Sequence, residues 1–311
     1  MELRALGPRV NVGALMIVGF PFVGAIAGLI SAGLGVGGGW LVTPFLLCLG
    51  RPPHDVVGTS LAFMAITSWS GVREHVRQGN LRAVPRNSIL ALILGTLIGT
   101  ESGRATLRAL ERLGWAPILL RTTLMVAFGF LGWQWLWGSV PVSRPPGLPA
   151  PGQRTRPSAL GLVFLGFLGG WVGGMAGLGG GTIVVPLLVN VVECSPSVAV
   201  PMSLCAVGVG ALWGTVRYAW YGHVDWVGAL GLGLGAWLVS GIGARAVTRL
   251  PREMFAKWFG ALLWLTAGGV ALGGAGWKRA ALGGILLGAT ALAGAMVVSV
   301  KHRPSSVHEP A

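Results

Sequence analysis

The sequence predicts an all-α polytopic membrane protein made of two inverted-topology repeats, each with a broken or re-entrant helix at a glycine cluster. Hydrophobic residues make up 53% of the chain and charged residues only 10%, whereas about a quarter of a soluble domain is charged. Apolar runs of about 20 residues, long enough to span a membrane, recur along the chain. The glycine-rich run Gly35–Gly39 has an echo at Gly177–Gly181, and both lie within long apolar stretches.

The two halves of the chain repeat each other. A shift of 142 residues places Gly24 on Gly166 and Pro44 on Pro186, and the matches continue with one extra residue to Ser60 on Ser203. Matches in the same order over roughly 90 residues indicate an internal repeat. Because each half contains an odd number of predicted crossings, the second half is expected to be inverted relative to the first.

The apolar segments define the expected elements in order. In the first half they cover about 12–34, 40–50, 56–72, 85–103 and 117–138. In the second half they cover about 158–176, 182–192, 197–216, 226–247 and 256–275, and a final run at 281–300 has no partner. The segment after each glycine cluster has about 11 residues, or roughly 16 Å as a helix, which is too short to cross about 30 Å of hydrocarbon.

These segments divide the chain into four parts. Residues 1–138 form the first transmembrane repeat, 139–157 a linker, 158–276 the second repeat, and 277–311 an extra helix and tail. The linker contains six prolines, a density that no helix tolerates. The N-terminal run resembles a signal peptide, but cleavage there would remove Gly24, so we predict a retained span.

Small-residue spacing predicts how the helices pack. The pattern G-x-x-x-G, which lets helix backbones approach closely in membranes, begins at Gly24, Gly95 and Gly166. We interpret these as packing seams within one chain, with dimer faces as the alternative. The three cysteines have no metal-type spacing, so we expect buried, unpaired thiols.

The net charge of +14 does not indicate a nucleic-acid partner. The arginines fall in short loops between apolar runs, where basic residues set membrane orientation. No long basic stripe with interleaved aromatic residues is present. The basic residues divide almost evenly between the two sides, so the orientation stays open.

Each glycine cluster is expected to end one helix and begin another. The first amides of a helix have no intrahelical partner and lie at the positive end of its dipole. Glycines remove side chains that would keep an anion away from those N–H groups. We therefore predict a cradle for a small oxyanion near mid-membrane, formed by Gly37, Gly38, Gly39, Gly179, Gly180 and Gly181.

Hydroxyl side chains follow both clusters at equivalent places. Ser60 and Ser203 correspond to each other, and we predict that they donate to ligand oxygens together with Thr59, whose counterpart is Met202. The alternative is that each hydroxyl bonds back to its own helix carbonyl, as is common in membrane helices.

The remaining ionisable residues indicate neither an enzyme nor a metal or cofactor site. The histidines and most acidic residues are expected in loops or the tail, without paired catalytic spacing. Glu101, near a span end, could relay protons or simply face a loop. Arg73 and Arg217 end corresponding segments and could guide anions inward or anchor their helices at the membrane surface.

One known family combines these features. The pattern G-x-G-G-G-x-x-x-x-P runs from Gly35 to Pro44 and from Gly177 to Pro186, followed by Ser60-Leu61 and by the equivalent Ser-Leu pair of the second half. Doubled in this way, it resembles the sulfite exporter family, TauE/SafE type, over about residues 13–300. The resemblance implies a permease that exports sulfite or a small organosulfonate, such as sulfoacetate, with ion coupling.

The prediction is therefore a secondary transporter in the cell membrane (inner or plasma) that exports a small sulfur oxyanion. Its expected partners are this anion, the lipid bilayer and a coupling proton or ion, with no nucleic acid. The alternatives are a transporter of a different small anion and a non-transporting membrane scaffold or assembly factor, whose glycines would serve packing alone. The sequence leaves the oligomeric state open.

Overall fold

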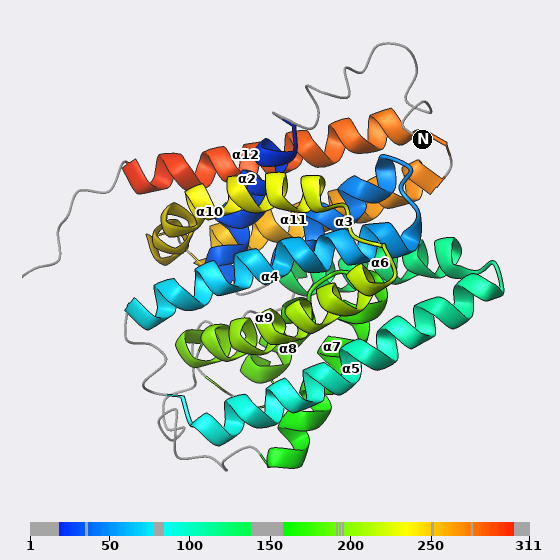
Figure 1. The fold of residues 1–311 in the computed structure, drawn as a ribbon. Coiled ribbons are helices and arrows are strands. Elements are labelled where there is room, and N and C mark those ends of the chain that lie inside the picture. The colour runs from blue at the N-terminus through cyan, green and yellow to red at the C-terminus, as the bar shows by residue number, and fades with distance from the viewer. Residues whose placement is uncertain are drawn as a thin grey trace, which may run out of the picture.

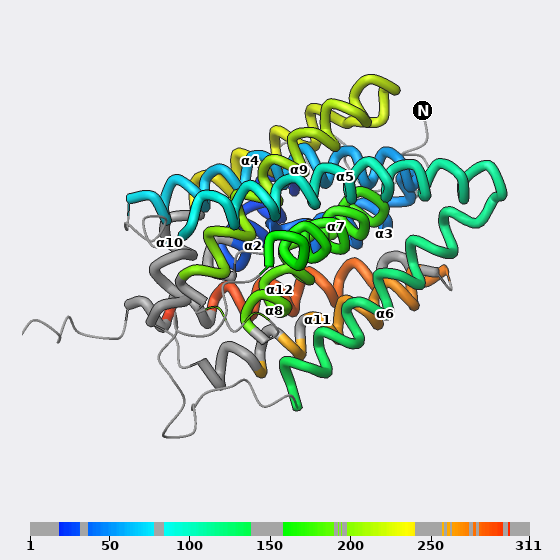
Figure 2. Tube along the Cα trace, turned by 90° about the horizontal axis from the view of Figure 1, so that it is seen from below, coloured from blue at the N-terminus to red at the C-terminus, as the bar shows by residue number. Residues whose placement is uncertain are grey.

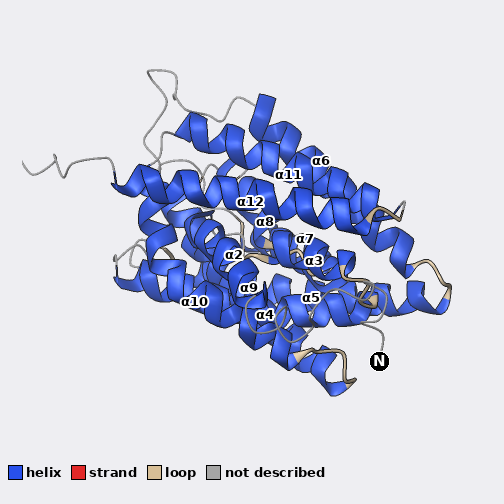
Figure 3. Ribbon diagram, turned by 90° about the horizontal axis from the view of Figure 1, so that it is seen from above, coloured by secondary structure: helices blue, strands red, loops and turns tan. Residues whose placement is uncertain are grey.

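The computed structural model describes residues 19–34, 37–77, 84–137, 158–190, 192, 194, 196–249, 252–274 and 276–301. Within these ranges the chain is helical and contains no strand (Figures 1 and 3), which confirms the predicted all-α class. The helices are α2 (Phe20–Leu34), α3 (Gly39–Cys48), α4 (Pro53–Arg77), α5 (Arg86–Arg112), α6 (Ala116–Trp137), α7 (Ala159–Ala176), α8 (Gly181–Asn190), α9 (Pro196–Trp220), α10 (Trp226–Arg249), α11 (Arg252–Gly274) and α12 (Lys278–Lys301).

The helices follow the predicted segments, including the two short ones. Helices α3 and α8 have 10 residues each and contain Pro44 and Pro186. Each extends about 15 Å, half of the hydrocarbon thickness, so neither crosses a membrane alone. The predicted linker at 139–157 and the signal-peptide-like start of the chain at 1–18 lie outside the described residues.

Several helices present apolar side chains outward. Three described helices are long and apolar enough to span a membrane: Ala116–Trp137, Ala159–Ala176 and Val198–Trp220. On the first of them Val126 is 70% exposed and Phe130 66% exposed. Apolar surface of this kind marks contact with lipid, and the fold is that of a polytopic membrane protein.

Two helix pairs join the halves along glycine seams. Helix α5 packs on α7, and α2 packs on α10. A Cβ added to Gly95 would lie 1.9 Å from the Val163 carbonyl oxygen, and one added to Gly235 would lie 1.8 Å from the Pro21 carbonyl oxygen. Val163 follows Pro21 by the same 142 residues that relate the repeats. The glycine spacing therefore serves close packing within one chain, as predicted.

The central helices α4 and α9 show the same correspondence. A Cβ on Gly71 would lie 3.0 Å from Leu204 Cδ1, and one on Gly214 would lie 2.8 Å from Leu61 Cδ1. Gly71 corresponds to Gly214 and Leu61 to Leu204, so the two contacts are equivalent under exchange of the halves. In both contacts a residue early in one helix meets a residue late in the other, so α4 and α9 run antiparallel. This is what inverted repeats require; inversion across a membrane stays a prediction.

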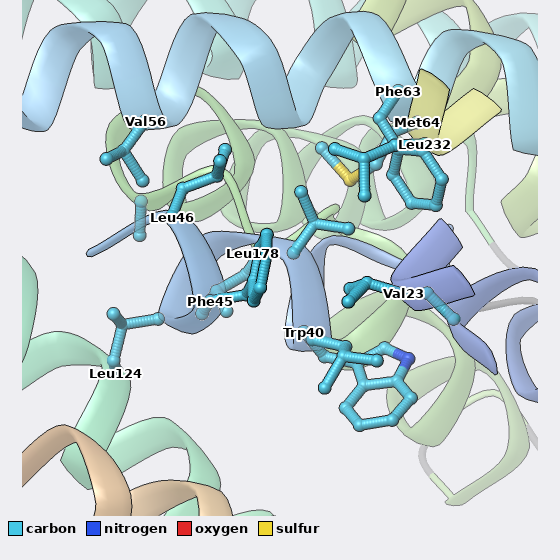
Figure 4. Packing of buried hydrophobic residues seen from close by; sticks show 14 of the residues in the cluster. Val23, Trp40, Phe45, Leu46, Val56, Phe63, Met64, Leu124, Leu178 and Leu232 are labelled. Atoms are coloured by element: carbon cyan, nitrogen blue, oxygen red, sulfur yellow. The ribbon is translucent and has the colours of Figure 1, made fainter. Parts of the chain in front are cut away.

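The short helix α3 lies in the largest apolar core. Figure 2 shows α4, α5 and α9 on one side of the molecule, α6, α11 and α12 on the other, and α2, α3 and α7 between them. Trp40 and Phe45 of α3 are fully buried in one cluster with Phe63 and Met64 of α4 and Leu232 of α10 (Figure 4). The glycine break that precedes α3 is thereby held at the centre of the protein.

Candidate functional site

The first glycine break joins α2 to α3. Gly37 and Gly38 have φ angles of 78° and 81°, a left-handed conformation that glycine adopts without strain. A Cβ on Gly38 would lie 2.7 Å from Phe63 Cε1, so even alanine would clash there. Thr67 Oγ1 lies 2.9 Å from the Gly37 carbonyl oxygen and 3.3 and 3.2 Å from the Phe63 and Met64 carbonyl oxygens of its own helix, so its single proton goes to the nearest acceptor, that of Gly37. The break is thus fixed by its backbone, by an aromatic wall and by one threonine. Gly35 and Val36 lie outside the described residues.

The second break joins α7 to α8 and has the same backbone character. Gly177, which caps α7, and Gly179 have φ angles of 65° and 74°. Thr43 Oγ1, from α3 of the other half, donates a hydrogen bond of 2.7 Å to the Gly177 carbonyl oxygen. At each break, therefore, a buried threonine hydroxyl occupies a carbonyl oxygen that the broken helix leaves free.

The two breaks touch each other. A Cβ on Gly39 would lie 2.2 Å from the Gly177 carbonyl oxygen and 2.9 Å from the carbonyl carbon of Leu178. On the other side of the second break, a Cβ on Gly180 would lie 2.6 Å from Gly169 backbone atoms. The predicted glycines of both halves thus form one junction, with Gly181 buried at the start of α8.

Ser60 lies at the second break, whereas Thr59 is directed elsewhere. Ser60 Oγ lies 3.0 Å from Thr43 Oγ1, and because the single Thr43 proton goes to the Gly177 carbonyl oxygen, Ser60 donates to Thr43. Thr59 Oγ1 accepts a hydrogen bond of 3.0 Å from the backbone N–H of Asp225, in the turn between α9 and α10. The structure therefore brings Ser60, and not the Thr59 hydroxyl, to the breaks.

Ser203 is fully buried on α9, at the position that mirrors Ser60. It lies one helical turn before Val207, whose Cγ1 would be 3.1 Å from a Cβ on Gly37. Ser60 thus lies against the second break, and Ser203 lies one helical turn from a residue that contacts the first break.

Ser68 is a further hydroxyl beside the first break. Its Oγ would lie 3.7 Å from a Cβ on Gly37. The residue is completely buried, and among the described residues its Oγ has no hydrogen-bond partner. A buried, unpaired hydroxyl is rare in proteins, because desolvation without a compensating hydrogen bond is costly.

A small cavity adjoins the second break. Its volume is about 10 Å³, close to the least that holds one water molecule. The threonine hydroxyls on its wall come from α5, and the bare backbone comes from the second break. The lining residues are Leu61, Met64, Thr96, Thr100, Gly170, Gly173, Gly179, Gly180, Val207, Gly210 and Ala211.

The sequence analysis missed the threonines and Ser68 because the repeat does not pair them. Thr43 corresponds to Val185, and Thr67 to Gly210. Between Gly24 and Gly79, the part of the repeat that holds the breaks, the only hydroxyls that match in both halves are those of Ser60 and Ser203. The available signal was position alone, since Thr43 directly precedes the proline of the short helix.

Charged side chains gather at one end of the molecule, where α4 begins, α5 ends and α9 turns into α10 (right side of Figure 1). Arg51 binds Asp225 at 2.9 Å, and His223 Nδ1 lies 2.9 Å from Asp55 Oδ1. Both pairs link the first half to the second, and they close this end of the interface between the halves.

His54 and His75 correct a prediction, because they lie on α4 rather than in loops. His54 is buried, with Nδ1 2.8 Å from Glu111 Oε2 and its ring 5.0 Å from that of His223. Burial, only partly opposed by the Glu111 carboxylate, lowers the pKa of His54. The neutral imidazole is therefore favoured in the folded protein.

Of the two alternatives for Glu101, the structure excludes the one in which it faces a loop. It lies on α5, where Arg217 Nε and NH2 donate to its two oxygens at 3.2 and 3.1 Å. Arg104, one turn further along α5, also donates to Glu101. Arg217 is therefore an ion-pair partner that connects α9 to α5, not a free anchor at the membrane surface.

Comparison with known proteins places this junction in a family. The sulfite exporter TauE/SafE family matches residues 20–272, with a second match at 162–301. The chain belongs to this family. The resemblance found from the doubled glycine pattern is confirmed.

Curated relatives of this chain are named as transporters. The probable membrane transporter protein YunE of Bacillus subtilis is 25% identical over 71% of this chain and 85% of its own length. A probable membrane transporter protein of Xylella fastidiosa is 28% identical over 73% of this chain and 83% of its own length. No solved structure matches the chain. With the family and the apolar helices, these names make the chain a multi-pass membrane transporter.

Proposed function

We propose that this transporter exports a small sulfur oxyanion, sulfite or an organosulfonate, that binds between the two glycine breaks. One observation carries the proposal: the breaks meet, and a threonine hydroxyl donates to a carbonyl oxygen of each. Carbonyl oxygens repel an anion, whereas the first amides of a helix attract it. With Gly37 and Gly177 carbonyls occupied, the starts of α3 and α8 favour an anion over a cation.

Three serines are proposed to complete the anion's shell. Ser68 is a buried donor without a described partner beside the first break. Ser203 lies on α9 at the position that mirrors Ser60. Ser60 gives its proton to Thr43 in the described conformation, so it would turn to the anion when the junction opens. Hydrogen bonds to a charged ligand are about twice as strong as neutral ones. No carboxylate is among the residues that line the cavity, which also favours an anion.

The described conformation is interpreted as closed around the breaks. A sulfite ion has four heavy atoms, and a cavity of about 10 Å³ leaves room for little more than one water molecule. Binding therefore requires the halves to part at the junction. Rocking of one half against the other, coupled to a proton or another ion, is the movement proposed to open it.

The family likeness is the reason for proposing a sulfur oxyanion, whereas the residues of the site indicate only a small anion. We therefore test it with purified protein in proteoliposomes, measuring the flux of radiolabelled sulfite with sulfate, nitrate and phosphate as competitors. Sulfite flux well above that of empty vesicles is expected, with weaker inhibition by the other anions. If the folded protein moved neither sulfite nor, in parallel vesicles, sulfoacetate in either direction, the proposal would be wrong.

Ser68→Ala is the sharpest variant for this test. Removing an unpaired buried hydroxyl should leave stability unchanged or raise it, while the loss of a hydrogen bond to a charged ligand should lower sulfite flux by about tenfold. Ser102→Ala is the matched control, since the Ser102 hydroxyl bonds only to its own helix at an exposed position. Glycine replacements cannot serve here, because the clash at Gly38 would destroy packing as well.

A further inference from the structure

Two arginines bind a single carboxylate on the C-terminal half of α5, and a third arginine lies near them. Arg217 binds both oxygens of Glu101, and Arg104 binds one of them. The guanidinium carbon of Arg108 lies 4.0 Å from the centre of the Tyr221 ring, which also lies near Arg104. One negative charge facing three positive charges leaves a surplus that attracts anions.

The nearby carboxylates offset this surplus only in part. Asp225 binds Arg51 and is neutralised by it. Glu111 lies against His54, whose neutral imidazole leaves the Glu111 charge in place. Three arginines therefore face two carboxylates, Glu101 and Glu111, and a net positive charge remains.

Arg104 carries a donor that the protein leaves unused. The residue is only 7% exposed, and its Nε is buried without a hydrogen-bond partner among the described residues. Leaving a buried charged donor unpaired is costly. The side chains of Arg217 and Glu101 are 32% and 36% exposed, so an oxyanion can reach these two side chains from outside, next to the buried Arg104.

The arginines stand directly beyond the cavity. Along α5, Thr100 lines the cavity and Arg104 follows about 6 Å further on. Along α9, Ala211 lines the cavity and Arg217 follows roughly 9 Å further on. Between them, Gly214 packs against Thr100. The same two helices thus lead from the arginine group to the second break.

We propose that Arg104, Arg108 and Arg217 form an outer anion site, which captures the substrate before it reaches the breaks. Its ligand is a small oxyanion with two or more oxygens, which guanidinium groups bind in a forked geometry. Glu101 is an internal competitor that holds the arginines until an anion replaces it. This inference rests on the proposed function, since it concerns the path of the same anion.

Opposite effects of two variants test the outer anion site. In proteoliposomes, Arg217→Gln should raise the half-saturating sulfite concentration by about tenfold, the lower end of what charged clefts add to association rates, with little change in maximal flux. Glu101→Gln should lower that concentration, because the competitor is gone. A purely structural ion pair predicts that both variants impair transport in the same direction.

Arg73→Gln is the matched control, because Arg73 is exposed near the corresponding end of α4. It should leave the half-saturating concentration unchanged. Arg108→Gln, which breaks no described ion pair, provides a second variant with the expected direction of Arg217→Gln. Added salt should raise the half-saturating sulfite concentration of the wild-type protein more than that of Arg217→Gln, because salt screens the charge of the arginines.

The outcomes separate this inference from the proposed function. If wild-type protein carries neither sulfite nor sulfoacetate, the proposed function fails, and the outer anion site fails with it. If wild-type protein carries sulfite but Glu101→Gln and Arg217→Gln shift the half-saturating concentration in the same direction or not at all, only the outer anion site is wrong.

Discussion

The two halves of this protein share their backbone geometry and differ in the side chains around their glycine breaks. The first half places Thr43 and Thr67 where the second half has Val185 and Gly210. Both threonines bind a break carbonyl, one in each half. The first half therefore supplies the hydroxyls that bind the Gly37 and Gly177 carbonyls, whereas Thr182 of the second half binds the Gly179 carbonyl of its own break at 3.0 Å.

The same asymmetry extends to the neighbouring positions. Ser31 accepts a hydrogen bond from the indole N–H of Trp40 at 3.3 Å, whereas the equivalent of Ser31 is Gly173, which lines the cavity. Ser68 corresponds to Ala211, another cavity residue. Small residues leave space beside the second break, whereas polar residues fill the equivalent space beside the first. The two halves therefore share a backbone fold but line the two breaks with different side chains.

Because the two halves pack along equivalent glycine seams, replacing matched seam glycines should reduce folding stability strongly and equally in both halves. A Cβ on Gly24 would lie 1.9 Å from the Leu232 carbonyl oxygen, and one on Gly166 would lie 2.2 Å from that of Leu92. Overpacking typically costs about 1–3 kcal/mol, and a clash with backbone exceeds this, so we expect no monodisperse protein from Gly24→Val or Gly166→Val in detergent size-exclusion chromatography.

Gly129→Ala provides the control for the seam variants, because nothing lies within 4 Å of a Cβ at Gly129. Alanine there should raise the melting temperature, since glycine within a helix costs about 0.5–1 kcal/mol relative to alanine. Recovery of folded protein from one member of the matched pair alone would show that the seams are not equivalent.

Removal of the threonine that joins the halves should have the next largest effect. Thr43→Val leaves the buried Gly177 carbonyl without its 2.7 Å donor and deprives Ser60 of its acceptor. An unsatisfied buried polar group costs about 1–3 kcal/mol, so the melting temperature in detergent should fall clearly. Thr122→Val is the control, because that exposed hydroxyl bonds only to its own helix. An unchanged melting temperature for Thr43→Val would contradict the role assigned to this residue.

His54, at the charged end of the interface, predicts that the stability of the protein depends on pH. Burial lowers the pKa of His54 below its ordinary value of about 6.5, so the unfolded chain takes up this proton at a higher pH than the folded protein. Stability should therefore fall as the pH drops below about 6.5. Ser197, at the corresponding position of the second half, does not titrate in this range.

His54→Asn should flatten this pH dependence, measured as melting temperature between about pH 7.5 and pH 5.5. His75, whose pKa is also lowered by burial, remains in both proteins, so the difference between them isolates His54. An equally steep fall in the variant would show that the buried imidazole of His54 is not the cause.

Periodicity and repetition made most of the fold predictable from the sequence. The apolar runs located the helices, and the doubled Gly35–Pro44 pattern located both breaks and the family. The G-x-x-x-G spacing at Gly95 and Gly166 identified helix seams, because only glycine permits backbones to approach so closely. These features depend on local backbone geometry, which a sequence records directly.

The polar contacts were less predictable, because they depend on pairs that lie far apart in the chain. Thr43 meets Gly177 across 134 residues, and Arg217 meets Glu101 across 116. The repeat directed attention to residues that match, such as Ser60 and Ser203, and away from Thr43 and Ser68, which do not. His54 was expected in a loop because α4 begins at Pro53, before the apolar run at about 56–72 that marked the span.

An exchange between the halves should have the smallest effect. Val185 is half-buried against Val72, Val200 and Leu204, and a threonine there can bond back to its own helix carbonyl. Val185→Thr alone should therefore cost less than about 1 kcal/mol, below the range for a fully buried unpaired hydroxyl. Its hydroxyl cannot replace that of Thr43, which reaches the Gly177 carbonyl from α3. The double variant with Thr43→Val should melt as low as Thr43→Val alone; restoration of the wild-type melting temperature would mean that either half can hold the junction, and that the asymmetry has no consequence for the fold.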